Sequence, residues 1–519
     1  MKQSDLIKRT LRHIGIIALV SLGLSLIFQL VLNVGAFFPG FLAAFILIFL
    51  SGSVLYTAWC LVGCPKALAW MIFAAFIIRL SFAVFFAWGL PRFGYPTRPQ
   101  EMGFVFEDSF RREENAWSLA KSGDPLITAF GDNYETDQYG GMLFLSAFIY
   151  RNLSPDAYRP ALISILSAGV MTLSIPFLWG AMNGRFATKT VLWAGWILAL
   201  YPEGILLGSA QLREPYFILL MSILFWSVIH IRERRKFRLS IPVFILSALS
   251  LFLFSFRMAI PMIGVMLLWF WVDLSKDIKR HWVKFAVWGG IILSGMTLLW
   301  LMRYWVDAVL FWDTLVSVRR SGLVQFQLES LPQWLHFPFI LVYGIFQPVL
   351  PAALAAPAPW IWRGLGIFRA LGWYALLPLL AYALIRVWSM PSSRKKRWMI
   401  LMVLFVWVWI LVASARAGGD QWDNPRYRTI FLPWMAITAG WGVTYAQETQ
   451  DRWLGRSLII EGIFLAFFTN WYFSRYYANI PRLDFWMMIG LIFLLNLTVI
   501  FGGWLLDRRR MGKIEKGGP

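Results

Sequence analysis

The sequence predicts an all-α polytopic membrane protein with about 14 transmembrane helices. Of its 519 residues, 59% are hydrophobic and only 14% are charged, whereas a soluble domain carries about 25% charged and 45–50% apolar residues. The chain also holds 30 Trp, 44 Phe and 17 Tyr, more aromatic mass than a water-soluble core of this size can bury. This composition excludes an ordinary soluble enzyme.

The spans are visible as apolar runs of about 17–25 residues, long enough to cross ~30 Å of hydrocarbon as helices. The first run is too long for a signal-peptide core and no small-residue cleavage site follows it, so we expect an uncleaved span. The predicted spans lie near residues 14–34, 36–60, 67–90, 160–181, 187–207, 213–230, 240–256, 258–274, 284–303, 372–389, 398–414, 429–446, 456–476 and 485–506.

The basic residues predict which loops face the cytoplasm. The formal net charge is +21, which in a soluble protein would suggest a nucleic-acid partner. Here the basic residues gather in short connections between apolar runs, and alternation from a basic cytoplasmic N-terminus places these connections inside, as the positive-inside rule requires. We therefore expect a plasma (inner) membrane protein with both termini in the cytoplasm and no nucleic-acid partner. The basic connections are residues 8–12, 232–238, 276–280, 394–397 and 508–510.

The same alternation places three connections outside, at residues 91–159, 304–371 and 415–428. The first is acidic, with nine carboxylates against five basic residues between positions 91 and 140. Two apolar stretches in these connections, 142–150 and 336–356, are too short or too rich in proline to span. We expect both to form helices at the outer interface.

The first candidate for chemistry is the acidic pair Glu107 and Asp108, just outside the third predicted span. The residues that follow, from Arg111 to Lys121, have helical spacing. A carboxylate on a short amphipathic helix at the membrane surface could act as general base on a substrate arriving there. The alternative is a solvated loop acid.

The other candidates are cationic or lie beside a cation. Arg213 and Glu214 precede Pro215 at the start of a predicted span, where an acid also favours the helix start. Arg257 lies in a predicted tight outer hairpin and either reaches the headgroups or binds a phosphate. The outer segment 418–428 ends in Arg426, Tyr427 and Arg428, and its arginines run against the positive-inside pattern, which favours an anionic ligand over headgroup contact.

Soluble-enzyme signatures are missing from the sequence: it has no P-loop, no G-x-G-x-x-G opening a helix, no H-E-x-x-H and no G-x-S-x-G. The four histidines and two cysteines form no metal-ligand pattern. The metal and cofactor requirement is unknown from the sequence, with a divalent cation left open.

Taken together, these motifs resemble the GT-C superfamily of membrane glycosyltransferases, in the branch of protein O-mannosyltransferases and the lipid A aminoarabinose transferase. As in that branch, an acidic motif follows a span and is trailed by alanines and a glycine. The chain departs from the family at Glu107-Asp108-Ser109 and Tyr139-Gly140-Gly141, so either acid can be the family's base. The matching positions are Asp108, Ala116, Ala120, Gly123, Pro202, Arg213-Glu214-Pro215 and Pro425-Arg426-Tyr427.

The resemblance covers residues 67–446, a GT-C-like core, with 1–66 as an added two-helix hairpin and 447–519 as C-terminal helices with a basic tail. It implies an inverting transfer of a sugar from a polyprenyl-phosphate donor to an extracytoplasmic lipid, glycan or protein. Asp108 or Glu107 would be the base, and Glu214 would position the donor or a metal. The leaving phosphate needs positive charge, for which Arg213, Arg257, Arg426 and Arg428 are candidates, with Tyr427 beside them.

Two other functions remain open. A flippase or exporter of lipid-linked sugars would also have many spans and interfacial arginines, but would place charges at mid-membrane and show two related halves. Arg79 is the only obvious charge deep in a predicted span, and no halves are evident. A polymerase or ligase of surface polysaccharide shares the donor type but not the early acidic loop.

Overall fold

The computed structural model describes residues 3–131, 140–234, 237–301, 330–477 and 479–516. Every regular element in these ranges is a helix. The helices form two compact units. Unit 1 comprises Met1–Leu274 with Thr429–Ala436, and unit 2 comprises Ser275–Arg428 with Ile437–Pro519. Three of the predicted loop acids, Asp132, Glu135 and Asp137, lie outside the described residues, as do positions 304–329 of the second outer connection.

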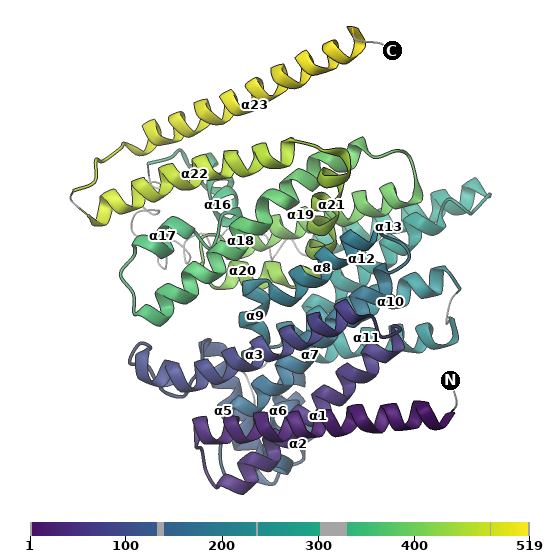
Figure 1. Ribbon diagram of the computed structural model, residues 1–519, viewed down its shortest axis with the longest axis vertical. Coiled ribbons are helices and arrows are strands. Elements are labelled where there is room, and N and C mark those ends of the chain that lie inside the picture. The colour runs from purple at the N-terminus through teal and green to yellow at the C-terminus, as the bar shows by residue number, and fades with distance from the viewer. Residues whose placement is uncertain (1–2, 132–139, 235–236, 302–329, 478, 517–519) are drawn as a thin grey trace. The chain divides into compact units, whose positions relative to one another are not determined.

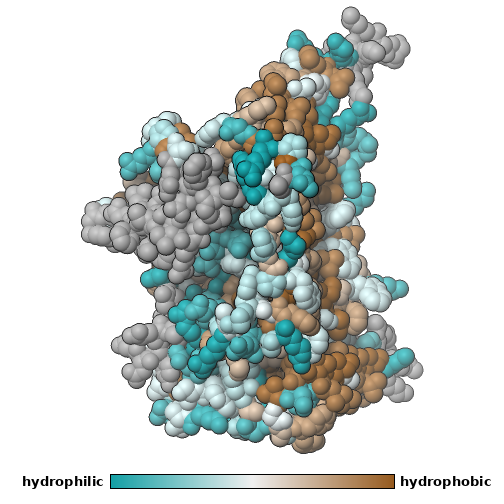
Figure 2. Space-filling view, turned by 90° about the vertical axis from the view of Figure 1, so that its left-hand side faces the viewer, coloured by the Kyte–Doolittle hydropathy of each residue, from teal (hydrophilic) through white to brown (hydrophobic). Residues whose placement is uncertain are grey.

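Eleven described helices are long and apolar enough to cross a membrane, which makes this a polytopic helical membrane protein. Figure 2 shows broad hydrophobic areas on the surface, as expected where helices face lipid. The eleven are α1 (Gln3–Leu32, from Leu11), α2 (Phe37–Leu61), α3 (Lys66–Phe93), α7 (Ala161–Met182), α10 (Glu214–Arg232), α11 (Phe237–Phe254), α12 (Phe256–Leu274), α18 (Trp360–Arg386), α19 (Arg394–Ala417), α22 (Trp453–Tyr476) and α23 (Phe485–Lys516) (Figure 1).

A twelfth span is formed if α8 (Thr188–Leu200) and α9 (Pro202–Gly208) are counted as one broken helix, bent by 51°. The two remaining predicted spans fall on α13 (His281–Leu301), whose apolar described part is short, and on α21 (Leu432–Thr449), which is not among the candidate spans. The number 14 therefore stays a prediction.

The predicted surface segments 142–150 and 336–356 form short helices. They are α6 (Gly141–Leu153), α16 (Gln333–Ile345) and α17 (Leu350–Ala355). The longest of these have 13 residues and reach only about 20 Å, so none crosses the bilayer as a straight helix. Their position at the outer interface stays a prediction.

In unit 1, α7 is the central helix and packs against α2, α3 and α10. Arg159 also holds the turn between α1 and α2, because it donates to the Val34 and Ala36 carbonyls at 2.9 Å. Arg159 also pairs with Asp156 at 2.6 Å, and its hydrogen bonds lower the pKa of the Asp156 carboxyl. Two further ion pairs lie at helix ends. Arg185, after α7, pairs with Glu233, after α10, at 2.6 Å, and Arg232 of α10 pairs with Asp273 of α12 at 2.9 Å.

The break between α8 and α9 explains the charge deep in α3. Tyr201 has an extended conformation before Pro202, because a residue preceding proline disfavours the helical region. The break leaves the last carbonyls of α8 without helical partners. Arg79 is fully buried and donates to the Leu198 and Ala199 carbonyls at 3.0 Å. This arginine therefore caps a broken helix.

In unit 2, α22 and α23 lie side by side (Figure 1). Arg456 and Asp507 join them through two hydrogen bonds of 2.5 and 2.8 Å. Asp451, in the turn before α22, pairs with Arg386 at the end of α18 at 2.6 Å. These ion pairs lie at helix ends, where charged groups keep access to water.

The predicted sidedness is tested by single cysteines in a chain whose Cys60 and Cys64 have been replaced. Ser122 and Ser392 are exposed and lie in connections predicted to face opposite sides. Ser392 is preferable to its neighbour Ser393, which caps α19 by accepting from the Lys396 backbone N–H at 3.1 Å. We expect an impermeant maleimide to label Ser122→Cys from outside and Ser392→Cys only from inside. Labelling of both from one side would contradict the predicted topology.

Candidate functional site

The acidic pair opens α5 (Glu107–Ser122), so the predicted amphipathic helix is confirmed. Both carboxylates lie in its first turn, where the helix N-terminus favours negative charge. Asp108 accepts a hydrogen bond from the Ser109 backbone N–H at 2.9 Å. Glu107 pairs with Arg111 at 3.1 Å, one turn further on. Both acids are exposed, so an incoming acceptor could reach either carboxylate.

The opposite face of α5 carries a buried carboxylate that sequence reasoning counted only as one more loop acid. Glu113 has no exposed surface. It accepts hydrogen bonds from Ser146 at 2.9 Å and from the Tyr150 hydroxyl at 2.7 Å, both on α6, and lies 3.6 Å from the Arg112 guanidinium. Burial, and then the charge of Glu113, raise the pKa of Tyr150, which keeps this hydroxyl a donor. Glu113 therefore holds α5 to α6.

Arg112 joins α5 to the start of α10. Its guanidinium donates a hydrogen bond to the carbonyl of Gln211, in the turn between α9 and α10. Arg213 is the residue preceding α10 and Glu214 is its first residue. Glu214 is buried, at 1% exposure. Unit 1 thus brings the helix that carries Asp108 against the turn that carries Arg213 and Glu214, about a hundred positions apart in the sequence.

Arg257 is the second residue of α12, and only Ser255 separates α11 from α12, as predicted for a tight hairpin. Its side chain is exposed. Tyr216, near the start of α10, stacks on Phe254 with ring centroids 4.7 Å apart. A Cβ at Gly141 of α6 would collide with the Leu253 carbonyl. These contacts place the α11–α12 turn at the same end of unit 1 as the start of α10 and α6.

The second group of predicted residues lies in unit 2 on α20 (Asp423–Thr429). Arg428 is fully buried, donates to the Gln347 carbonyl at 2.7 Å and has its Cζ 3.3 Å from the ring centroid of Trp373. Arg426 is also buried and lies 3.9 Å from Asp423. Asn424 fixes the segment by donating to the Gly344 and Gly418 carbonyls.

Two arginines that sequence reasoning missed lie beside this segment. Arg369 of α18 is buried, with its Cζ 4.2 Å from the ring centroid of Trp422. Arg416 at the end of α19 lies 5.2 Å from the ring of Tyr427, whose carbonyl accepts from the indole of Trp409 at 2.9 Å. Arg369 could have been found from the sequence, because it is a charged residue within the long apolar segment that forms α18. Arg369, Arg416, Arg426 and Arg428 form what we name the arginine cluster.

The predicted site residues thus fall into two groups. Unit 1 contains Glu107, Asp108, Arg213, Glu214 and Arg257, and unit 2 contains Arg426, Tyr427 and Arg428. Each group is brought together inside its own unit, and the expected role of both groups at one leaving phosphate stays a prediction. Among the described residues, no three His, Cys, Asp or Glu side chains gather as they would around a metal ion, and the divalent cation also stays a prediction.

Comparison with models of known protein families, with curated protein sequences and with solved structures found no match. The resemblance to GT-C glycosyltransferases therefore depends on the residues named above.

Proposed function

We propose that this protein is a membrane glycosyltransferase that moves a sugar from a polyprenyl-phosphate donor to a lipid, glycan or protein acceptor outside the cytoplasm. The observation that supports this most strongly is the hydrogen bond from Arg112 to the Gln211 carbonyl. It holds the helix bearing Asp108 against the turn bearing Arg213 and Glu214. An exposed carboxylate and a cation are thereby held at one end of unit 1, and transfer from a phosphate-linked sugar needs both.

In the proposed reaction, the Asp108 carboxylate takes the proton of the acceptor hydroxyl. The acceptor oxygen attacks the anomeric carbon while the bond from that carbon to the phosphate oxygen breaks. The bonding electrons leave with the polyprenyl phosphate, and a single displacement inverts the anomeric centre. Because Glu107 is engaged by Arg111, we assign the proton transfer to Asp108 and a supporting role to Glu107.

The leaving phosphate gains negative charge and needs fixed positive charge nearby. Arginine suits this role because its planar guanidinium binds phosphate oxygens through paired hydrogen bonds. We assign it to Arg213 and Arg257, which lie in the same unit as Asp108, while Arg426 and Arg428 with Tyr427 stay candidates that the resemblance implies. Glu214 would position the donor or a divalent cation. A lipid-linked donor is met at the membrane interface, which the proposal places on the outer side of the inner membrane.

The test uses the purified full chain in lipid vesicles, a polyprenyl-phosphate sugar labelled in the sugar, and a range of acceptors. Transfer releases free polyprenyl phosphate and places the label on an acceptor. Movement of the intact donor across the bilayer without cleavage would instead identify a flippase or exporter. Products that grow by repeating units would identify a polysaccharide polymerase. Intact, unmoved donor with every acceptor would contradict the proposal.

A further inference from the structure

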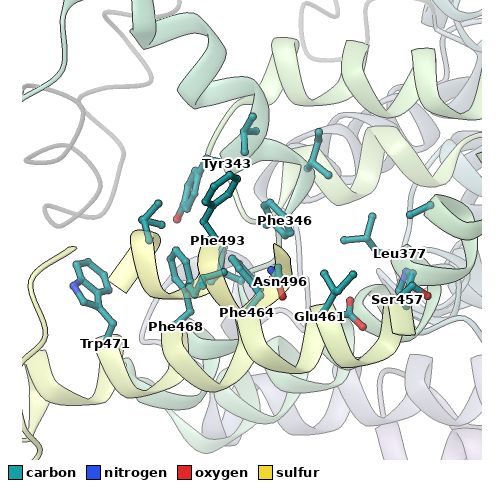
Figure 3. A pocket seen from close by; sticks show the side chains of 18 of the residues that line it. Tyr343, Phe346, Leu377, Ser457, Glu461, Phe464, Phe468, Trp471, Phe493 and Asn496 are labelled. Carbon is teal, nitrogen blue, oxygen red and sulfur yellow. The ribbon is translucent and has the colours of Figure 1, made fainter. Parts of the chain in front are cut away.

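Unit 2 contains a cavity of about 850 Å³ that includes none of the residues assigned to transfer. Helices α16, α18, α19, α22 and α23 contribute to its lining, and most of its wall is aromatic or aliphatic. A cavity of this size is in the range that holds a small-molecule ligand, roughly 300–1,000 Å³. In Figure 3, lining side chains such as Phe346, Phe464 and Glu461 point toward the space between these helices.

One face of α22 provides a continuous wall. The lining residues of this helix recur at steps of three and four, which is the spacing of a single helix face. The polar residues of this wall, Ser457 and Glu461, lie toward the start of the helix, and its aromatic residues lie toward the end. The lining residues of α22 are Ser457, Ile460, Glu461, Phe464, Phe468, Trp471 and Tyr472.

Glu461 is the only Asp, Glu, Lys or Arg among the described residues that line the cavity. It lies about two turns into α22, a candidate membrane span, where a carboxylate is costly unless it is paired. Its Oε1 atom is buried and has no hydrogen-bond partner among the described residues. The nearby Arg456 is already joined to Asp507 by two hydrogen bonds.

A second acceptor faces the same cavity from α23. Asn496 lines it, and its Oδ1 atom is also buried without a hydrogen-bond partner in the described part of the chain. The hydroxyl hydrogen of Ser457 is donated to the Leu454 carbonyl at 2.7 Å, so its oxygen presents only lone pairs to a ligand. The polar end of the cavity therefore offers two acceptor atoms without a partner among the described residues, Glu461 Oε1 and Asn496 Oδ1, which donors on an occupant would satisfy.

We propose that this cavity binds an amphiphile with a long apolar chain and a primary amine. The ammonium group carries positive charge and three donors, which match the carboxylate of Glu461 and the oxygen of Asn496. The apolar chain would lie along the aromatic wall, where Phe464 stacks on Phe346 and packs at a tilt against Phe468, with ring centroids 4.5 Å apart in both pairs. This site is separate from the proposed transfer reaction, and its test does not require transfer.

The test uses the full chain in vesicles containing one of three diazirine-bearing probes of equal chain length: a primary amine, an alcohol or a carboxylate. Photolabelled peptides are identified and quantified by mass spectrometry. We expect the amine to label peptides of α22 and α23 roughly tenfold more than the alcohol, because a charge-assisted hydrogen bond exceeds a neutral one by about this factor in affinity. The carboxylate should label them least. Equal labelling by amine and alcohol would overturn the proposal.

Two variants and a control locate the site. Glu461→Gln keeps the side-chain shape and should lower amine labelling to the level of the alcohol, while alcohol labelling stays unchanged. Leu377→Trp should fill the cavity and remove labelling by both probes. Glu448→Gln changes an exposed acid outside the cavity and should change nothing. Amine labelling that survives Glu461→Gln in a chain with an unchanged melting temperature would contradict the assignment.

Discussion

Replacement of Asp108 by Asn is expected to lower the rate of sugar transfer about a hundredfold, a typical rate loss when an enzyme loses its general base. The amide keeps the size of the side chain but cannot accept the proton of the acceptor hydroxyl. Asp108 is exposed at the start of α5, so folding should be unaffected. The measurement is release of polyprenyl phosphate at saturating donor and acceptor, with expression and melting temperature checked in parallel.

The controls separate a general base from a generic loop charge. Glu107→Gln removes the neighbouring acid of the same turn and should reduce transfer much less, because that acid is held by Arg111. Asp124→Asn changes an exposed acid in the loop after α5 and should leave transfer unchanged. Near-normal activity of Asp108→Asn would remove Asp108 from the mechanism. A large loss in Glu107→Gln alone would move the base to Glu107.

Replacement of Glu113 by Ala is expected to lower the free energy of unfolding by about 3–5 kcal/mol, the usual cost of breaking a buried ion pair from one side. The variant would leave the Arg112 guanidinium buried without its carboxylate and would remove the acceptor for Ser146 and Tyr150. Because Arg112 also holds the turn before α10, transfer should fall as well. Denaturant titration in detergent micelles measures the stability change.

Two milder variants show whether charge or hydrogen bonding is responsible. Glu113→Gln keeps an oxygen acceptor but loses the charge, so its free energy of unfolding should lie between those of the wild type and Glu113→Ala. Tyr150→Phe removes one hydrogen bond to the carboxylate and should cost about 1 kcal/mol. If Glu113→Ala were no more destabilising than Tyr150→Phe, the buried carboxylate would not hold α5 to α6.

Most of the helical layout could be predicted from the sequence. The runs at 36–60 and 160–181 lie within about one residue of α2 and α7, because whether about 20 residues can cross a bilayer depends on their own composition and length. The short amphipathic helix after Asp108 is also a local property, since helical periodicity needs no distant partner. Pro202 marked a break that the predicted span 187–207 passed over, although the residue before a proline disfavours the helix.

The site could be predicted only in part. The sequence by itself determined the class of protein, the placement of its apolar helices and the exposed acid pair at the start of α5, because each follows from residues close together in the chain. The tertiary structure decided that Glu113 is buried, that Arg79 caps α8, that Arg369 joins the arginine cluster and that Glu461 faces a cavity. Each of these depends on which distant helix supplies the neighbouring atoms, and a polar side chain carries no local signal of the partner that will satisfy it.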